Sequence, residues 1–157
     1  MGYVDELRMA VEDATPKLIA LGDSSAKRPA PGKWAPREIV GHLIDSASNN
    51  HQRFVRGQLQ EDLVFPGYAQ EDWVRIGRYA DAPWEELVTL WRTFNLQIAR
   101  LMEGTPEEVR MRPRALHNLR EIGVPLAPNE PGRLEHVMRD YVVHLRHHLA
   151  QIFPVPR

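Results

Sequence analysis

Apolar residues recur at alternating steps of three and four in four long segments of the chain, which is the spacing of one face of an α-helix. These segments cover about residues 3–21, 36–59, 83–104 and 133–153. Evidence for strands is thin, because the candidates 63–65 and 122–126 are too short to build a sheet. The pattern therefore predicts an all-α fold, an up-and-down four-helix bundle with two long connections.

Prolines and glycines indicate where these helices are interrupted. Pro16 lies inside the first segment and should bend or split that helix. In the connector 61–79, residues 70–76 are predicted to form one short helical piece, and the segment 105–131, with five prolines, is predicted to be a loop with one short helix at most. A chain of 157 residues is a common size for one domain, so residues 1–157 are expected to form a single domain.

Composition excludes several classes of function. The chain has no cysteine, so disulfides, thiolate metal ligands and cysteine nucleophiles are excluded, and a metal would need nitrogen or oxygen ligands. Its 20 Lys and Arg against 21 Asp and Glu lack the basic excess that nucleic-acid binding needs. No apolar stretch approaches the ~20 residues of a membrane span, and acidic residues lie where a signal peptide would be basic. We expect a cytoplasmic protein that binds neither nucleic acid nor membrane.

Three histidines lie close together on the last predicted helix: His144, His147 and His148. At 100° per residue, the first and third of them lie about 40° apart on one face, and His147 points away from both. His144 and His148 can therefore share a metal ion, and His147 is not expected to join them. Histidines that are only solvated or hydrogen-bonded on an ordinary helix would give the same pattern.

A polar stripe on the second predicted helix offers a third ligand. Its members recur at steps of three and four: Glu38, His42, Ser46, Asn49 and Arg53. Helix bundles build metal sites from side chains on facing helices, so His42 is the candidate to complete a three-histidine site. Three protein ligands leave coordination positions open, which is typical of catalytic ions that activate water or a thiol. The alternative is a stripe that simply faces solvent.

The remaining candidates carry less weight. Leu145 and Arg146 stand where a metalloprotease motif would have its glutamate base, so that chemistry is not predicted. Either Glu38 or Asp45 could accept a proton or only cap and solvate the helix, and the structural role is favoured for Asp45. Structural roles are expected for five further aromatic side chains: His51, His117, His136, Trp84 and Trp91.

Several of these motifs resemble one family. The resemblance is carried by Trp34–Ser46 (WAPREIVGHLIDS), Asn49, Arg53-Phe54, Pro66-Gly67-Tyr68, Asp72-Trp73 and Tyr141–Ile152 (YVVHLRHHLAQI). Together they resemble the DinB-like superfamily, in particular its bacillithiol S-transferase (YfiT-like) branch. The resemblance implies an up-and-down four-helix bundle, often a homodimer, with a nickel or zinc ion held by three histidines. Carried onto this sequence, these ligands are His42, His144 and His148. The segment between the third and fourth helices departs from the family pattern, so substrate identity is not transferred.

The resulting hypothesis is a metal-dependent enzyme that uses one divalent ion to activate a low-molecular-weight thiol or water against a small-molecule substrate. Asn49 and Arg53 are candidates to orient an anionic cosubstrate, since a guanidinium suits carboxylates. Gln151, one turn beyond His148, is a candidate for supporting the ligand or walling the pocket. The alternative class is a non-catalytic metal-binding module, either a sensor or a structural dimer, and a bundle without metal is a third possibility.

Overall fold

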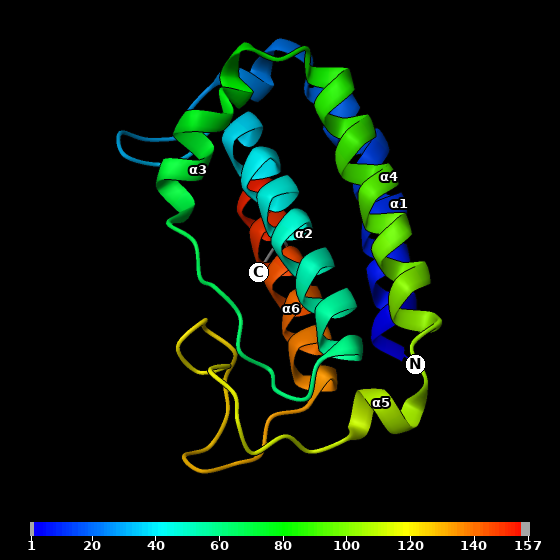
Figure 1. Cartoon of the computed structure of the whole chain (residues 1–157). Coiled ribbons are helices and arrows are strands. Elements are labelled where there is room, and N and C mark those ends of the chain that lie inside the picture. Colours follow the sequence, from blue (N-terminus) through cyan, green and yellow to red (C-terminus); the bar gives the residue numbers. More distant parts are fainter. Residues whose placement is uncertain (1, 155–157) are drawn as a thin grey trace.

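The computed structural model describes residues 2–154, and all of its regular structure is helical (Figure 1). Four long helices form the bundle: α1 (Gly2–Leu21), α2 (Pro36–Leu59), α4 (Trp84–Glu103) and α6 (Leu134–Ile152). The connections contain four shorter elements: η1 (Gly22–Ala26), α3 (Gln70–Gly77), η2 (Tyr79–Asp81) and α5 (Glu107–Met111). Instead of strands, the described residues contain two isolated bridges, Leu63–His117 and Arg114–Gly132. The predicted four-helix bundle is thus confirmed.

Successive long helices of the bundle do not simply alternate in direction. The start of α1 meets the start of α6, where Tyr3 Oη donates to Glu135 Oε2 at 2.7 Å, so these two helices run in parallel. The end of α1 meets the start of α4, where Trp84 Nε1 donates to Leu18 O at 2.7 Å, so that pair is antiparallel. Figure 1 shows α2 and α4 both starting at the upper end of the bundle. Because α2 and α4 run in the same direction, the chain between them must return along the length of the bundle.

One continuous helix covers the segment that contains Pro16. Of the two expected effects, a bend or a split, the split does not occur. Proline removes one backbone hydrogen bond, and the buried residues on either side of it, Val11, Ala14 and Leu18, still face the core. Burial of Val11 and of Leu18 contributes roughly 1.5–3 kcal/mol each, which offsets the lost hydrogen bond.

The core lies between the four long helices and includes two of the tryptophans. Trp91 is fully buried and Trp84 is 6% exposed, as the sequence predicted. The other large and fully buried side chains come from every bundle helix and include Leu7, Leu18, Phe54, Ile98, Met138 and Leu145. No helix in the described part of the chain is long and apolar enough to span a membrane.

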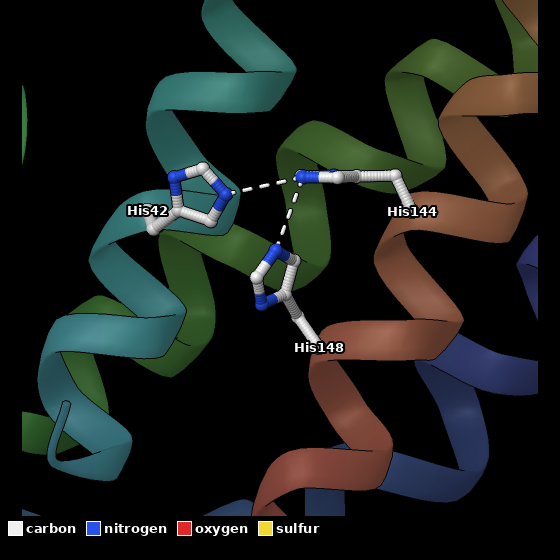
Figure 2. Close-up of side chains that lie close together, drawn as sticks. All are labelled: His42, His144 and His148. Carbon is white, nitrogen blue, oxygen red and sulfur yellow. Dashed lines mark hydrogen bonds between the residues drawn. The ribbon is translucent and has the colours of Figure 1, made fainter. Parts of the chain in front are cut away.

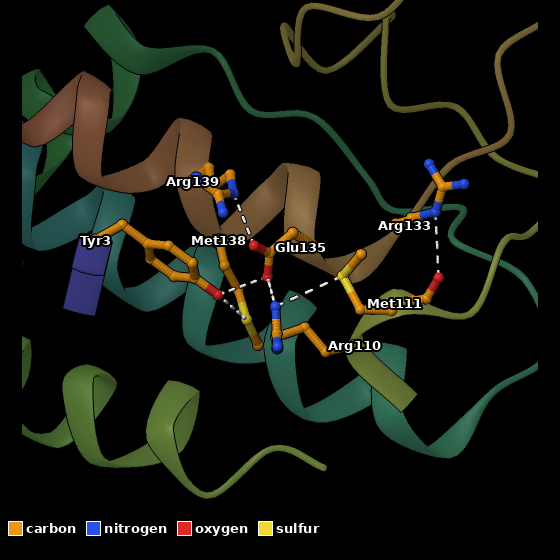
Figure 3. A network of polar contacts seen from close by, with 7 residues as sticks. All are labelled: Tyr3, Arg110, Met111, Arg133, Glu135, Met138 and Arg139. Atoms are coloured by element: carbon orange, nitrogen blue, oxygen red, sulfur yellow. Dashed lines mark hydrogen bonds and ion pairs between the residues drawn. The ribbon is translucent and has the colours of Figure 1, made fainter. Parts of the chain in front are cut away.

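A buried carboxylate fixes the start of α6 (Figure 3). Glu135 accepts hydrogen bonds from Tyr3 Oη at 2.7 Å and Arg139 Nε at 2.7 Å, and it pairs with Arg110 of α5. Burial alone would raise the pKa of Glu135, but these hydrogen bonds outweigh it and hold the pKa below its usual range. The network ties α1, α5 and α6 together and so sets the position of the helix that carries two candidate ligands.

The returning segment is seated on α2 through Tyr79. The Tyr79 ring packs directly against two glycines. A Cβ added to Gly41 would lie 2.1 Å from Tyr79 Cδ2, and one added to Gly77 would lie 2.6 Å from Tyr79 Cε2. Only glycine therefore fits at either position. The Tyr79 hydroxyl donates to Asp45 Oδ1. Two glycines and one partly buried hydrogen bond therefore hold α3 and η2 against the helix that carries His42.

Candidate metal centre

The structure brings together the three histidines that the sequence singled out (Figure 2). His42 comes from α2, and His144 and His148 come from successive turns of α6. His144 Nε2 lies 3.1 Å from His42 Nε2 and 3.1 Å from His148 Nε2. The three rings thus turn one nitrogen each toward a common point between the two helices.

Close packing of α2 against α6 makes this meeting possible. A Cβ on Gly57 would come within 2.8 Å of Leu134 Cδ1, so glycine allows the helices to approach at this end. One turn earlier, Phe54 packs edge-on against Tyr141, with ring centroids 5.8 Å apart. These contacts set the register that brings His42, which is completely buried, opposite the two histidines of α6.

Burial keeps the three imidazoles neutral. Burial, together with the neighbouring histidines, lowers the pKa of His42 to about 3 and that of His144 to about 4. Burial also lowers the pKa of His148, although its hydrogen bond to Gln151 acts in the opposite direction. Neutral imidazole is the form that binds metal ions, so at neutral pH each ring is in the state a ligand requires.

The arrangement of donor atoms fits a cation better than hydrogen bonds alone. An imidazole nitrogen offers one hydrogen or one lone pair, so His144 Nε2 cannot satisfy both of its contacts. His148 Nδ1 lies 2.9 Å from Gln151 Oε1, which favours a proton on Nδ1 and leaves the Nε2 lone pair facing the cluster. Nitrogens about 2 Å from one tetrahedral ion lie roughly 3.3 Å apart, close to the spacing seen here. The residues therefore suit a divalent metal ion.

The other histidines lie outside this cluster. His147 is exposed on α6, and its Nε2 lies 3.4 Å from Gln151 Nε2 rather than near the converging nitrogens. His117 Nε2 contacts Glu130 O at 2.9 Å, and His136 Nδ1 accepts from Arg133 N at the start of α6. His51 packs against a phenylalanine ring of α4. These contacts agree with the structural roles predicted for the last three.

A hollow of about 400 Å³ opens beside His144, and we call it the Arg53 hollow. Its other walls include Ser46, Asn50, Tyr68, Gln70, Glu121 and Asp140. Arg53 is only 7% exposed, and its guanidinium makes two long hydrogen bonds, to Asn50 Oδ1 at 3.4 Å and Pro66 O at 3.3 Å. Burial lowers the pKa of Arg53, and the nearby Tyr68 and Asp140 counteract this. A buried cation with such weak hydrogen bonds is suited to an anionic ligand.

A second hollow, of about 560 Å³, opens beside His148 on the side of Trp34, and we call it the Trp34 hollow. The Trp34 ring lies 5.1 Å from the His42 ring and 6.5 Å from the His148 ring, measured between centroids. Gln151 and Gln70 also line this hollow. The Arg53 hollow adjoins the cluster at His144 and the Trp34 hollow adjoins it at His148. Gln70 lines both hollows.

Asn50 occupies the position beside Arg53 that helical spacing suggested for Asn49. The Asn49 amide donates to Asp45 O at 2.9 Å, and its side chain lines a separate hollow on the outer side of Arg53. Asn50 is the amide that lines the Arg53 hollow. Asp140 lines it too and was missed, although it lies one turn before His144 at the same four-residue step that relates His144 to His148.

The two acids of α2 have structural partners. Glu38 Oε1 accepts from Ala35 N at 3.0 Å, and Glu38 Oε2 pairs with Arg28 at 2.9 Å, so this residue caps the helix. Asp45 is only 6% exposed and accepts a hydrogen bond from Tyr79, so it does not face solvent as expected. Burial raises the pKa of Asp45. Neither side chain lines either of the two hollows beside the cluster.

Comparison with known proteins agrees with this architecture. Residues 7–152 match a family model described as the DinB superfamily. The structure is similar to that of YfiT from Bacillus subtilis, described as a probable metal-dependent hydrolase with an unusual four-helix bundle topology. The TM-score is 0.77 at 20% sequence identity, over 97% of this chain and 82% of the other, and at this identity the likeness shows the fold. No curated protein matches the chain.

Proposed function

The chain belongs to the DinB superfamily, and on that premise we propose that it is a metal-dependent enzyme in which His42, His144 and His148 hold one divalent ion, zinc or nickel. The observation that supports this most directly is the convergence of three neutral imidazole nitrogens, with two Nε2–Nε2 distances of 3.1 Å. Two hollows adjoin the cluster, which favours an enzyme over a module that only uses the ion as a structural link.

The reaction class follows from the ligand set. When bound by three histidines, such an ion keeps open positions and lowers the pKa of a water or low-molecular-weight thiol, which makes it a nucleophile near neutral pH. The reaction would be hydrolysis of a small molecule or transfer of the thiol to it. In either case the protein's task is to hold the substrate beside His144 or His148, with Gln151 keeping the His148 lone pair directed at the cluster.

Arg53 gives the substrate a chemical class. Its guanidinium has five donors, and its two long hydrogen bonds leave capacity for a carboxylate or a similar anion. Tyr68 and Asn50 share the hollow and can donate to the same group. We propose that the anionic part of the substrate or cosubstrate lies in the Arg53 hollow. Asn49 is less suited to this task, because it lines a separate hollow rather than the Arg53 hollow.

The deciding experiment is the metal content of the untagged protein, measured by inductively coupled plasma mass spectrometry. We expect about one zinc or nickel ion per chain, lost in His148→Ala and retained in the matched variant His147→Ala, since His147 lies outside the cluster. Wild-type protein that stays free of metal after zinc and nickel are offered would overturn the proposal. Equal loss in both variants would overturn the assignment of ligands.

The non-catalytic alternative is tested on the same samples. A closed structural ion contributes folding energy directly, so chelation should unfold the protein. An enzyme with a preformed hydrophobic core should instead keep its helical circular dichroism after chelation and recover its metal on dialysis against zinc. Cooperative unfolding on chelation at 25 °C would favour the structural role.

A further inference from the structure

We propose that the Trp34 hollow is a subsite for an uncharged aromatic ring of the substrate, joined to the group that reaches the three histidine nitrogens. The inference rests on the proposed function, since it assumes a metal ligated by His42, His144 and His148. It adds a second recognition element, distinct from Arg53, and assigns the ring to the hollow beside His148 and the anionic group to the hollow beside His144.

The position of His148 connects this hollow to the reacting centre. His148 lines the Trp34 hollow, and its Nε2 is also one of the three converging nitrogens. A ligand in the hollow therefore borders directly on the cluster. Its volume of about 560 Å³ is in the range of small-molecule sites, and it exceeds what a single water or thiol group would fill.

Trp34 is placed for recognition rather than for filling the core. Trp84 and Trp91 are buried among the bundle helices, whereas Trp34 is half-buried in the loop before α2. Its ring lies against His42 and lines the hollow with Pro29, Ala30 and Ile39. An indole ring provides a wide apolar face, and stacked or edge-on rings stabilise each other beyond simple burial of area.

The charges around the two hollows differ in kind. The Trp34 hollow has Lys33 and Glu71 on its walls, both exposed and opposite in charge, so they largely cancel and are screened by solvent. The Arg53 hollow instead contains a buried guanidinium, with Asp140 and Glu121 on its other walls. Among the residues that the structure describes, the Trp34 hollow has no buried charged side chain on its walls, which favours an uncharged ring there.

Two metal-binding probes test this inference. Benzohydroxamate and acetohydroxamate share the chelating group and differ in the aromatic ring, so the ratio of their dissociation constants reports on the ring alone. On zinc-loaded wild-type protein, titration calorimetry should give benzohydroxamate about tenfold tighter binding, an order of magnitude typical of one well-packed ring. In Trp34→Ala this advantage should fall to about twofold or less, and in Trp34→Phe most of it should remain.

Two further variants separate the ring subsite from general effects. Trp73→Ala removes an exposed tryptophan outside both hollows and should leave the ratio unchanged. Ala30→Phe fills the hollow from an exposed loop position and should weaken benzohydroxamate more than acetohydroxamate, even if Trp34→Ala proves unstable. Zinc content is measured for every variant, so that loss of metal is not mistaken for loss of the ring subsite.

The outcomes distinguish this inference from the proposed function. Wild-type protein that holds neither zinc nor nickel when both are offered, or that binds neither hydroxamate when loaded with metal, would overturn both. Zinc-loaded protein that binds both probes equally would overturn the ring subsite alone and leave the metal site intact. The same holds if the preference for benzohydroxamate survives in both Trp34→Ala and Ala30→Phe.

Discussion

His148 Nδ1 and Gln151 Oε1 lie 2.9 Å apart on the last turns of α6. This contact links a candidate ligand to a residue three positions further along the same helix, so helix geometry alone maintains it. Its chemical effect is to favour the His148 tautomer whose Nε2 lone pair faces the other two histidines. His42, by contrast, has no hydrogen-bond partner for Nδ1 among residues 2–154. A hydrogen bond thus specifies the tautomer of His148, whereas none in the described part of the chain specifies that of His42.

Removal of this contact should weaken metal binding without abolishing it. Gln151→Leu should lower the affinity for zinc about 10- to 100-fold, the usual effect of losing a group that orients a ligand. Competition with a chromophoric chelator at pH 7 measures it. Gln151→Glu keeps the acceptor oxygen and should remain near wild type. Unchanged affinity in Gln151→Leu would show that the hydrogen bond does not orient His148.

Substitution of Arg53 should remove a preference for anionic ligands. With cobalt in place of zinc, thiol binding is followed by the thiolate-to-cobalt absorption band, which requires no knowledge of the natural substrate. Mercaptosuccinate should bind roughly tenfold more tightly than 2-mercaptoethanol, since hydrogen bonds to charged groups contribute about 1.5–3 kcal/mol. Arg53→Gln should abolish most of that preference while 2-mercaptoethanol binding stays constant. Equal loss for both thiols would point to a collapsed hollow instead.

The Glu135 network should make stability depend on pH in the acid range. The pKa of Glu135 is lower in the folded than in the unfolded state, so its contribution is fully present above its unfolded pKa and is lost as pH falls through the folded pKa. Glu135→Gln should cost about 2–3 kcal/mol at pH 7, because Tyr3, Arg110 and Arg139 lose a charged partner. Urea denaturation at pH 7 and pH 3 measures the difference, which should shrink at the lower pH.

An exposed ion pair provides the matched control for that experiment. Glu103 pairs with Arg8 at 2.7 Å, but both side chains are accessible to solvent. Glu103→Gln should therefore leave the urea midpoint nearly unchanged at either pH. A difference between wild type and Glu135→Gln that is the same at pH 3 as at pH 7 would contradict the role assigned to the buried carboxylate.

Periodicity predicted the helices well because one apolar face of each packs against the core. The bounds of α2 are those expected, 36–59, and α3 and α5 lie where short helices were expected. The direction of each helix in the bundle could not be predicted in this way, since the spacing of apolar residues is the same whichever way the helix runs. The parallel arrangement of α2 and α4 depends on contacts between residues far apart in the sequence, such as that of Tyr79, shortly before α4, with Asp45 of α2, and no local pattern encodes it.

In the candidate site, too, local features could be predicted from the sequence and the packing between helices could not. The three histidines could be selected because a four-residue step on one helix and a polar stripe on another are local features. Which flank of the stripe faces α6 could not be determined, because Asn49 and Asn50 lie only 100° apart on α2. The packing of α2 against α6 decides in favour of Asn50 and brings Asp140 into the same hollow.

The parallel course of α2 and α4 also explains where substrate selectivity can change. A tight turn would suffice between antiparallel neighbours, but here the chain must travel back along the whole bundle, and on its way it supplies Tyr68 and Gln70 to one hollow and Gln70 and Glu71 to the other. The ligands lie on α2 and α6, outside this stretch. Substitutions in residues 61–79 can therefore change which molecules bind while the bundle and its three clustered histidines stay the same.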